Sequence, residues 1–349
     1  MNKKIIILGA GISGLYLGHV LKKEGFNIQI IEANNRIGGR IFTKTIKNTK
    51  VELGATWLWK YNSELLKLCK ALNISIFEQN MHGDALFEAN TLTPTQRFKI
   101  NDNQEVSYRI VGGTKTLLDK LHDNLSADEI ITNQKVVTVI GNSTSIKVIT
   151  KNTTFSADVV ISTIPPQLLV NSIDFSPPLN SNVIRIAKNT HTWMKDSIKF
   201  AVVYQRPFWK EHGLSGVGFS NVGPFTEIYD HTDFDNKHFA LMGFLNGALS
   251  HQSKIIRIKK IQEQLFKFFG DDGKNYLFYE EKVWSKETFL NVGNDNFTSP
   301  HYNNGHSIYQ QHYLNERFII AGSETSPHYG GYMEGAIIRG NEVLQQLKK

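Results

Sequence analysis

The chain has 349 residues, which can bury a large core and are many for one compact unit, so we expect two domains that share an interface. Charged residues make up 20% and aromatic residues 11% of the chain, a composition that excludes a disordered protein. The net charge of +7 is spread over scattered lysines and arginines, which argues against a nucleic-acid partner and indicates solubility.

Cysteine use and hydropathy narrow the class of protein further. Cys69 is the only cysteine, which excludes an internal disulfide and a thiolate metal cluster and is typical of a reducing compartment. No apolar stretch approaches the roughly 20 residues that span a bilayer, and the apolar run after Lys4 is too short for a signal peptide. We therefore predict a cytoplasmic protein with no membrane partner. The sequence indicates no particular oligomeric state.

The first forty residues have the pattern of a strand, a glycine turn and a helix. Four aliphatic residues, 5–8, lead into Gly9-Ala10-Gly11-Ile12-Ser13-Gly14, and leucines and valines at helical spacing follow. A second apolar run, 28–31, ends in Glu32, where a dinucleotide-binding unit places the carboxylate that holds a ribose hydroxyl. A glycine turn without a ligand is the alternative. The strand, the helix and Glu32 together favour a dinucleotide site.

Each glycine of this turn has a physical task. Gly9 permits the tight turn, Gly11 lets the backbone approach a pyrophosphate, and Gly14 lets the helix pack on the strand. The N-terminus of the helix then faces the anion with its free N–H groups. We therefore assign cofactor contacts to this turn, Ser13 included, and to Glu32.

The segment after Glu32 distinguishes a flavin from a nicotinamide. Glu32-Ala33-x-x-Arg36-x-Gly38-Gly39-Arg40 resembles the segment that lies along the FAD pyrophosphate in the flavin-containing amine oxidase superfamily. The resemblance implies FAD as cofactor, with Ala33, Gly39 and Arg40 among its contacts.

Four later parts of the chain resemble the same superfamily. The string from Glu52 to Trp57 is similar to a segment whose backbone approaches the flavin ring, and the helix opening Gly330-Gly331-Tyr332-Met333-Glu334-Gly335-Ala336 is similar to the family signature. Val136 matches a valine that meets adenine, and Trp284 matches a tryptophan near the flavin. The resemblance thus implies further cofactor contacts at Gly54, Ala55, Thr56, Trp57, Val136, Trp284, Gly322, Glu324, Gly331, Tyr332, Met333 and Ala336.

Lys199 is the candidate catalytic residue. In the expected strand from Ser197 to Tyr204, alternation puts Lys199 on the same face as Ala201 and Val203, and inward lysines are rare. The alternative is an edge lysine that extends to solvent. The flanking Tyr-x-x-Pro-Phe-Trp resembles the family strand whose lysine holds a water at flavin N5, which favours the catalytic role.

The resemblance also implies how the flavin and the substrate are held. Family members with a covalent flavin have a cysteine nine residues after the tryptophan that Trp284 matches, and here that position is Gly293, so we expect non-covalent FAD. Tyr332 matches one of two facing cage aromatics and is our second catalytic candidate. The other aromatic position falls at Asn294, which leaves half of that cage missing.

We predict an α/β protein: an FAD/NAD(P)-binding Rossmann-like domain with a second, mixed α+β substrate domain, as in the amine oxidase two-domain fold. The expected FAD-binding domain comprises residues 1–78, 108–178 and 284–349, and the expected substrate domain comprises 79–107 and 179–283. The region from 74 to 106 is polar and irregular, with a turn or helix start at 91–95. It is much shorter than the helical insertion that the family places there.

The predicted function is FAD-dependent oxidation of a C–N bond in a small amine, with imine hydrolysis and reoxidation of the flavin by oxygen to give hydrogen peroxide. An amino-acid oxidase is one alternative, with Arg109 or Arg206 as the carboxylate-binding residue. A renalase-like oxidase of dihydronicotinamides and a flavin-binding scaffold without turnover are the others. His301, His306 and His312 lack the spacing of a metal site, so we expect no metal, while His328 lies beside the signature and is a possible flavin neighbour.

Overall fold

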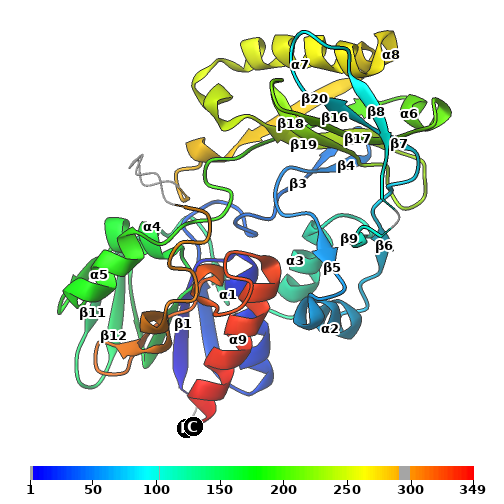
Figure 1. The fold of residues 1–349 in the computed structure, drawn as a ribbon. Helices are drawn as coiled ribbons and strands as arrows, with labels where there is room; N and C mark the ends of the chain where they lie inside the picture. Colours follow the sequence, from blue (N-terminus) through cyan, green and yellow to red (C-terminus); the bar gives the residue numbers. More distant parts are fainter. Residues whose placement is uncertain (1–2, 102, 291–298) are drawn as a thin grey trace.

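The structure is a computed structural model, and it describes residues 3–101, 103–290 and 299–349. The chain folds into two halves that lie one above the other in Figure 1, each built around its own sheet. The lower half contains both ends of the chain and the upper half its middle. A cavity lies between the halves.

The lower half is organised around a sheet with strand order β10-β2-β1-β14-β22-β21. Its central strand, β1, pairs in parallel with β2 and β14, and only the last strand, β21, is antiparallel. The strands are β1 (Lys4–Leu8), β2 (Asn27–Ile31), β10 (Ile130–Ile131), β14 (Val159–Ser162), β21 (His312–Tyr313) and β22 (Phe318–Ile320).

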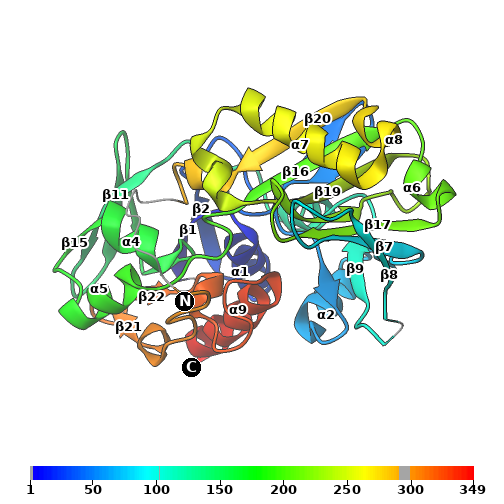
Figure 2. The same cartoon turned by 45° about the horizontal axis from the view of Figure 1, so that its top comes forward.

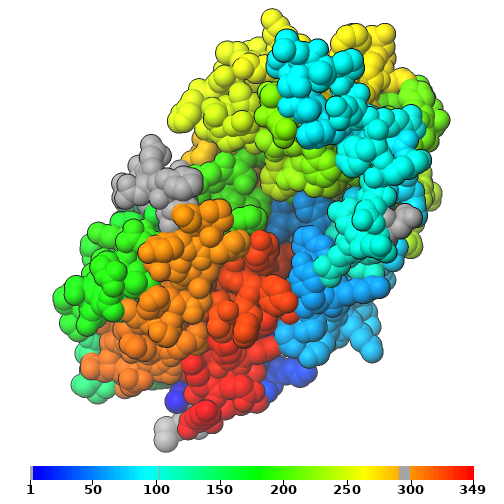
Figure 3. Space-filling view, in the orientation of Figure 1, coloured from blue at the N-terminus to red at the C-terminus, as the bar shows by residue number. Residues whose placement is uncertain are grey.

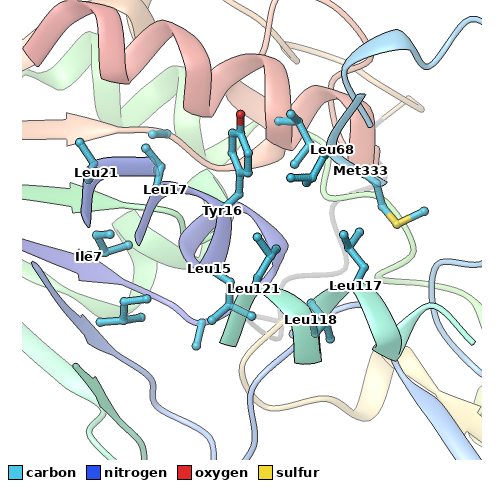
Figure 4. Packing of buried hydrophobic residues seen from close by; sticks show 14 of the residues in the cluster. Ile7, Leu15, Tyr16, Leu17, Leu21, Leu68, Leu117, Leu118, Leu121 and Met333 are labelled. Atoms are coloured by element: carbon cyan, nitrogen blue, oxygen red, sulfur yellow. The ribbon is translucent and has the colours of Figure 1, made fainter. Parts of the chain in front are cut away.

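Strand β1 is apolar and buried from Ile5 to Leu8 because both faces of this sheet are covered. Ile5 and Ile7 join one buried cluster, and Ile6 and Leu8 join another. The first cluster packs under α1 (Ile12–Lys23), α3 (Lys115–His122) and the C-terminal α9 (Met333–Lys348), as Figure 4 shows around Tyr16, Leu17 and Leu121. This layered parallel arrangement confirms the predicted Rossmann-like fold.

The second face of the parallel sheet is covered by a smaller sheet and two helices. The smaller sheet has the order β13-β12-β11-β15. Its strands are β11 (Val136–Gly141), β12 (Ile146–Thr150), β13 (Thr154–Ala157) and β15 (Asp174–Ser176), and the helices are α4 (Pro166–Ser172) and α5 (Ser181–Lys188). Val183 and Ile186 of α5 lie in the same buried cluster as Ile6. We therefore propose that the substrate domain begins after α5, later than the residue 179 expected from the proline pair.

The upper half is a sheet with strand order β20-β16-β19-β18-β17-β7-β8, covered on its outer side by α7 (Lys254–Phe269), as Figure 2 shows. Its strands are β7 (Asp84–Glu88), β8 (Gln96–Lys99), β16 (Ile198–Tyr204), β17 (Leu214–Ser220), β18 (Phe225–Asp230), β19 (Phe239–Leu245) and β20 (Phe278–Val283), and two short helices, α6 (Phe208–Glu211) and α8 (Asp271–Lys274), accompany it. Phe200 and Val202 of β16 face α7, while Ala201 and Val203 face the lower half.

The polar region from 74 to 106 contains strands where the sequence indicated none. β7 pairs in parallel with β17, and β8 adds an exposed edge strand antiparallel to β7. β6 (Ile76–Glu78) forms a small sheet with β5 (Leu58–Trp59) and β9 (Ser107–Ile110), beside α2 (Ser63–Ala71). The β8 side chains all face solvent, so this strand lacks the apolar alternation that would have revealed it.

The two halves are joined by a hairpin of β3 (Thr43–Ile46) and β4 (Thr49–Glu52). Val51 and Leu53 pack with Ala201 and Met242 on the inner face of the upper sheet. This contact holds the segment after β4 against β16. That segment, residues 54–57, forms part of the cavity wall. No helix in the described ranges is both long enough and apolar enough to cross a membrane.

Candidate active site

A cavity of about 950 Å³ lies between the two halves. Its lining joins the glycine turn after β1, the end of β2, the segments 36–41 and 54–61, and the inner face of the upper sheet. Most of the residues that the sequence singled out contribute to this lining. They are Gly9, Gly11, Ser13, Glu32, Ala33, Gly39, Arg40, Gly54, Ala55, Thr56, Trp57, Val136, Lys199, Trp284, Gly331, Tyr332 and Met333.

The other four predicted residues are buried behind the lining. A Cβ on Gly14 would lie 1.9 Å from the carbonyl oxygen of Gly9, so this glycine lets α1 approach the turn. Glu324 and Ala336 have no exposed surface, and Gly322 is buried beside the end of β14. Their position indicates support of the cavity wall, and direct cofactor contact stays a prediction for them.

The glycine turn has the shape that a pyrophosphate requires. Gly9 has φ +98°, and a Cβ on Gly11 would meet its nearest neighbour, Gly39 Cα, only at 4.0 Å, so the space above Gly11 is open. Helix α1 begins at Ile12, and its N-cap residue, Gly11, has no side chain that could cap the helix. The free N–H groups of its first turn therefore face the cavity, where an anion would satisfy them.

Glu32 lies at the carboxyl end of β2 with its carboxylate fixed by backbone. One oxygen accepts from the N–H of Ala10 at 2.7 Å and the other from the N–H of Asn34 at 2.7 Å. A carboxylate oxygen has two lone pairs, so each can accept one further hydrogen bond from a ribose hydroxyl. These residues fit the adenosine and pyrophosphate portions of FAD.

Arg40 connects three segments at the next part of the cavity. Its Nη2 donates to Glu324 Oε2 at 3.0 Å and to Ser323 Oγ at 2.9 Å, and its Nη1 donates to the carbonyl oxygen of Trp193 at 3.2 Å. The Glu324 side chain is completely buried, and that of Arg40 is 20% exposed. This ion pair therefore ties the glycine-rich segment to the start of the C-terminal signature.

Lys199 points inward from β16 and is 1% exposed, so the alternative of a solvent-extended lysine is wrong. Its Nζ donates to the carbonyl oxygen of Gly54 at 2.7 Å and to Thr56 Oγ1 at 2.6 Å. It also lies 4.9 Å from the ring centre of Trp57 and 5.0 Å from that of Phe244. Burial lowers the pKa of Lys199 to about 7, while the charges of Glu52 and Glu227 act in the opposite direction. A lysine amine has three donors when charged, so one remains for a group in the cavity.

The two arginines considered for a substrate carboxylate lie elsewhere. Arg109 is buried, donates to the carbonyl oxygen of Thr232 and contacts His231 Nδ1 at 2.9 Å, and lines a smaller cavity of about 210 Å³. Arg206 is half exposed and pairs with Glu211 and Asp272. Neither belongs to the lining of the large cavity.

The cavity lining contains aromatic residues that the sequence did not reveal. Trp59, Tyr61 and Tyr329 form a parallel stack, with ring centres 5.9 Å and 5.7 Å apart. Tyr61 and Tyr329 remain 44% and 41% exposed. The space-filling view shows the segments around residues 60 and 330 side by side on one face (Figure 3). The stack joins positions far apart in the sequence, so periodicity could not reveal it.

Trp193, Tyr229, Phe244 and Glu227 also line the cavity. The Tyr229 hydroxyl donates to Glu227 Oε2 at 2.5 Å, and burial together with the charge of Glu227 raises the pKa of Tyr229. Glu227 and Phe244 are opposite each other on β18 and β19. Strand alternation offered a signal for this inward carboxylate, since Glu227 and Tyr229 share a face of β18.

Gly293 and Asn294 lie outside the described residues, so the covalent bond and the second cage position stay predictions. His328 is exposed and is not part of the lining. His301 instead stacks on Tyr332, with ring centres 5.2 Å apart. Among the described residues, no three histidine, cysteine, aspartate or glutamate side chains are grouped as metal ligands.

Comparison with known proteins decides the family. The family model of flavin containing amine oxidoreductases matches residues 76–347, and that of an NAD(P)-binding Rossmann-like domain matches residues 7–72. The chain belongs to the flavin containing amine oxidoreductase family. It is accordingly an FAD-dependent amine oxidase, and the cavity described above is its candidate active site.

Its relatives are distant but extend over the whole chain. The probable flavin-containing monoamine oxidase A of Dictyostelium discoideum is 21% identical over 99% of this chain and 97% of its own. The flavin-containing amine oxidase B of Homo sapiens is 23% identical over 98% of this chain and 85% of its own. The Dictyostelium alignment is 450 residues long, so that relative has segments without a counterpart among these 349 residues.

Solved amine oxidase structures share the fold. Putrescine oxidase, in a structure with bound putrescine, superposes with a TM-score of 0.87 at 19% identity and covers 100% of this chain and 99% of its own. Cyclohexylamine oxidase from Brevibacterium oxydans IH-35A superposes with a TM-score of 0.86 at 16% identity, with both chains fully covered. At these identities the likeness concerns the two-domain fold.

Proposed function

We propose that this amine oxidase removes two electrons and two protons from the amine-bearing carbon and nitrogen of a small amine, giving an imine. Water then hydrolyses the imine to an aldehyde or ketone and releases the nitrogen as ammonia. Oxygen takes up the two electrons and two protons and becomes hydrogen peroxide. The observation that carries this proposal is the buried Lys199, which faces the cavity beside the Gly54 segment.

Bound FAD supplies the two-electron acceptor for this reaction, and the protein supplies orientation and a dry site. The glycine turn and Glu32 would hold its dinucleotide end, while the segment from Gly54 to Trp57 and the N-terminus of α9 would border its ring. The positive end of that helix would stabilise negative charge on the ring. Lys199, fixed by Gly54 and Thr56, can direct its remaining N–H at a water or at oxygen in the cavity.

The aromatic lining favours an amine that enters as the neutral form. The ring centres of Trp57 and Phe244 lie 4.9 Å and 5.0 Å from Lys199 Nζ, and an apolar wall disfavours an ammonium ion that has lost its water. The lowered pKa of Lys199 has the same cause, since burial away from water disfavours its charged form. Burial of the reacting end would therefore select the uncharged amine.

Glu227 favours a substrate with a second, positively charged group. It is a partly buried carboxylate on the cavity wall with a single described donor, the Tyr229 hydroxyl. An alkylammonium reaching it would form a charge-assisted hydrogen bond. A diamine such as putrescine, which a solved relative binds, has one amine for oxidation and one for this carboxylate. We therefore propose diamines as the narrower substrate class.

The amino-acid oxidase alternative has less support, because neither Arg109 nor Arg206 reaches the large cavity. The other two alternatives, an oxidase of dihydronicotinamides and a flavin-binding scaffold without turnover, are distinguished by the following experiment. The protein is loaded with FAD and given oxygen with a panel of monoamines, diamines, amino acids and dihydronicotinamides. We expect peroxide and aldehyde in equal amounts with amines. Peroxide from dihydronicotinamides alone, or from none of the compounds, would reject the proposal.

We further propose that FAD is held without a covalent bond and that the protein is cytoplasmic. The absence of a cysteine at Gly293 supports the first point. Denaturation of the yellow protein should release the flavin into the supernatant. Flavin that stays with the precipitated chain would contradict it.

A further inference from the structure

Trp193 lies on the cavity wall beside Tyr332, although its place in the sequence, in the loop between α5 and β16, gave no reason to select it. The ring centres of Trp193 and Tyr332 are 5.4 Å apart, and the ring planes are inclined by 44°. Two aromatic residues from segments far apart in the chain thus form one continuous surface.

The ring of His301 packs against both of these rings. Its ring stacks on Trp193 at 4.8 Å and 21° and on Tyr332 at 5.2 Å and 23°. Its Nδ1 contacts the carbonyl oxygen of Gly330 at 3.1 Å, and its backbone N–H donates to His191 Nδ1 at 3.3 Å. Each of the three rings therefore contacts the other two, and the orientation of each is restrained.

The backbone holds Trp193 in this place independently of its side chain. Its carbonyl oxygen accepts from Arg40, which is paired with Glu324, and the next residue, Met194, is buried with φ +68°. Gly331 has φ +89°, and a Cβ there would lie 3.1 Å from Trp193 Cβ. Both loops are thus shaped around the position of this indole.

The distance between the rings determines how a substrate can use them. A methylene group held between two ring faces needs about 7 Å between them, twice a carbon–carbon contact. At 5.4 Å, Trp193 and Tyr332 leave no room between their rings. A substrate must instead lie along the surface that they share.

We propose that Trp193 is a substrate-contacting residue that joins Tyr332 in a one-sided aromatic wall, along which the alkyl part of the amine lies during its oxidation. This inference rests on the proposed function. It assigns to the loop between α5 and β16 a role in selecting the substrate. A wall on one side admits saturated rings as well as linear chains, so cyclohexylamine and putrescine both lie against it.

The test compares variants of the FAD-loaded protein by anaerobic flavin reduction with cyclohexylamine and with putrescine. Trp193→Leu keeps apolar volume and removes the aromatic face, while Trp193→Phe keeps a face. Tyr302→Ala is the matched control, since Tyr302 is on the neighbouring loop, 54% exposed and outside the cavity lining. The thermal shift produced by each amine gives a second measure of binding that does not depend on turnover.

We expect Trp193→Leu to lower the ratio of reduction rate constant to dissociation constant by about tenfold or more for at least one amine, and to reduce the thermal shift. Trp193→Phe should stay within about threefold of the unmodified protein, and Tyr302→Ala should not differ from it. Equal behaviour of the Leu and Phe variants would overturn the proposal. If no amine of the panel above reduces the flavin of the unmodified protein, the proposed function itself fails and the inference with it.

Discussion

Lys199 Nζ donates a 2.7 Å hydrogen bond to the carbonyl oxygen of Gly54. This bond connects β16, which lies next to the edge strand β20 of the upper sheet, to the backbone segment that borders the predicted flavin ring. A Cβ on Gly54 would lie 2.2 Å from the carbonyl oxygen of Arg40. The backbone at Gly54 is therefore packed closely against the segment at Arg40 as well as against Lys199. Lys199, the candidate catalytic residue, is therefore held at the contact between the two halves.

Replacing Lys199 by methionine should slow flavin reduction or reoxidation by about tenfold or more, because the donor aimed at the cavity is lost while the apolar stem is kept. Stopped-flow spectroscopy of each half-reaction measures the effect. Lys210→Met is the control, since Lys210 pairs with Asp230 at 3.1 Å away from the large cavity. Unchanged rate constants in Lys199→Met would leave Lys199 with a packing role.

The charge of Lys199 should appear in the pH dependence of flavin reoxidation. Burial lowers its pKa from 10.5 to about 7, so the amine is charged below pH 7 and becomes neutral above it. A positive charge beside the cavity favours electron transfer to oxygen, on which negative charge develops. The rate constant for reoxidation should thus fall as pH rises through about 7, and Lys199→Met should lose this inflection. The same inflection in the methionine variant would assign it to another group.

The buried ion pair of Glu324 and Arg40 should contribute to stability. Glu324→Gln leaves the Arg40 guanidinium without its anion, which we expect to cost about 3 kcal/mol of unfolding free energy. Glu211→Gln, which removes one of the two acidic partners of Arg206 at an exposed site, should cost less than about 1 kcal/mol. Urea unfolding without FAD measures both. Equal costs would show that the burial of Glu324 has no energetic consequence.

Glu227 should discriminate diamines from monoamines. Glu227→Gln removes the negative charge and keeps the shape, so putrescine should lose about tenfold or more in apparent affinity while cyclohexylamine changes by less than about threefold. Dissociation constants from anaerobic flavin reduction test this. A similar loss for both amines would indicate a general role of Glu227 in shaping the cavity.

The sequence predicted the cofactor half well because its signals are local. The buried run at 5–8, the glycines 9–14 and Glu32 are fixed by backbone requirements of one turn, and the structure places them as expected. Lys199 was predicted by strand alternation together with its flanking residues, and its burial confirms that it faces inward.

The substrate side could be predicted only in part because its contacts are not local. Trp193, Tyr61 and Tyr329 come from loops without periodicity, and only the packing of those loops brings their rings to the cavity. The strands between 76 and 99 were also missed, since an exposed edge strand such as β8 carries no apolar alternation. The second cage position, Asn294, lies outside the described residues.

The most direct test of the amine oxidase assignment is anaerobic titration of the FAD-loaded protein with amines, followed by flavin absorbance. The amine oxidase assignment predicts that at least one monoamine or diamine bleaches the flavin completely, and that admission of oxygen restores the absorbance with release of hydrogen peroxide. Flavin that stays oxidised with every amine, while the protein remains folded and saturated with FAD, would contradict it.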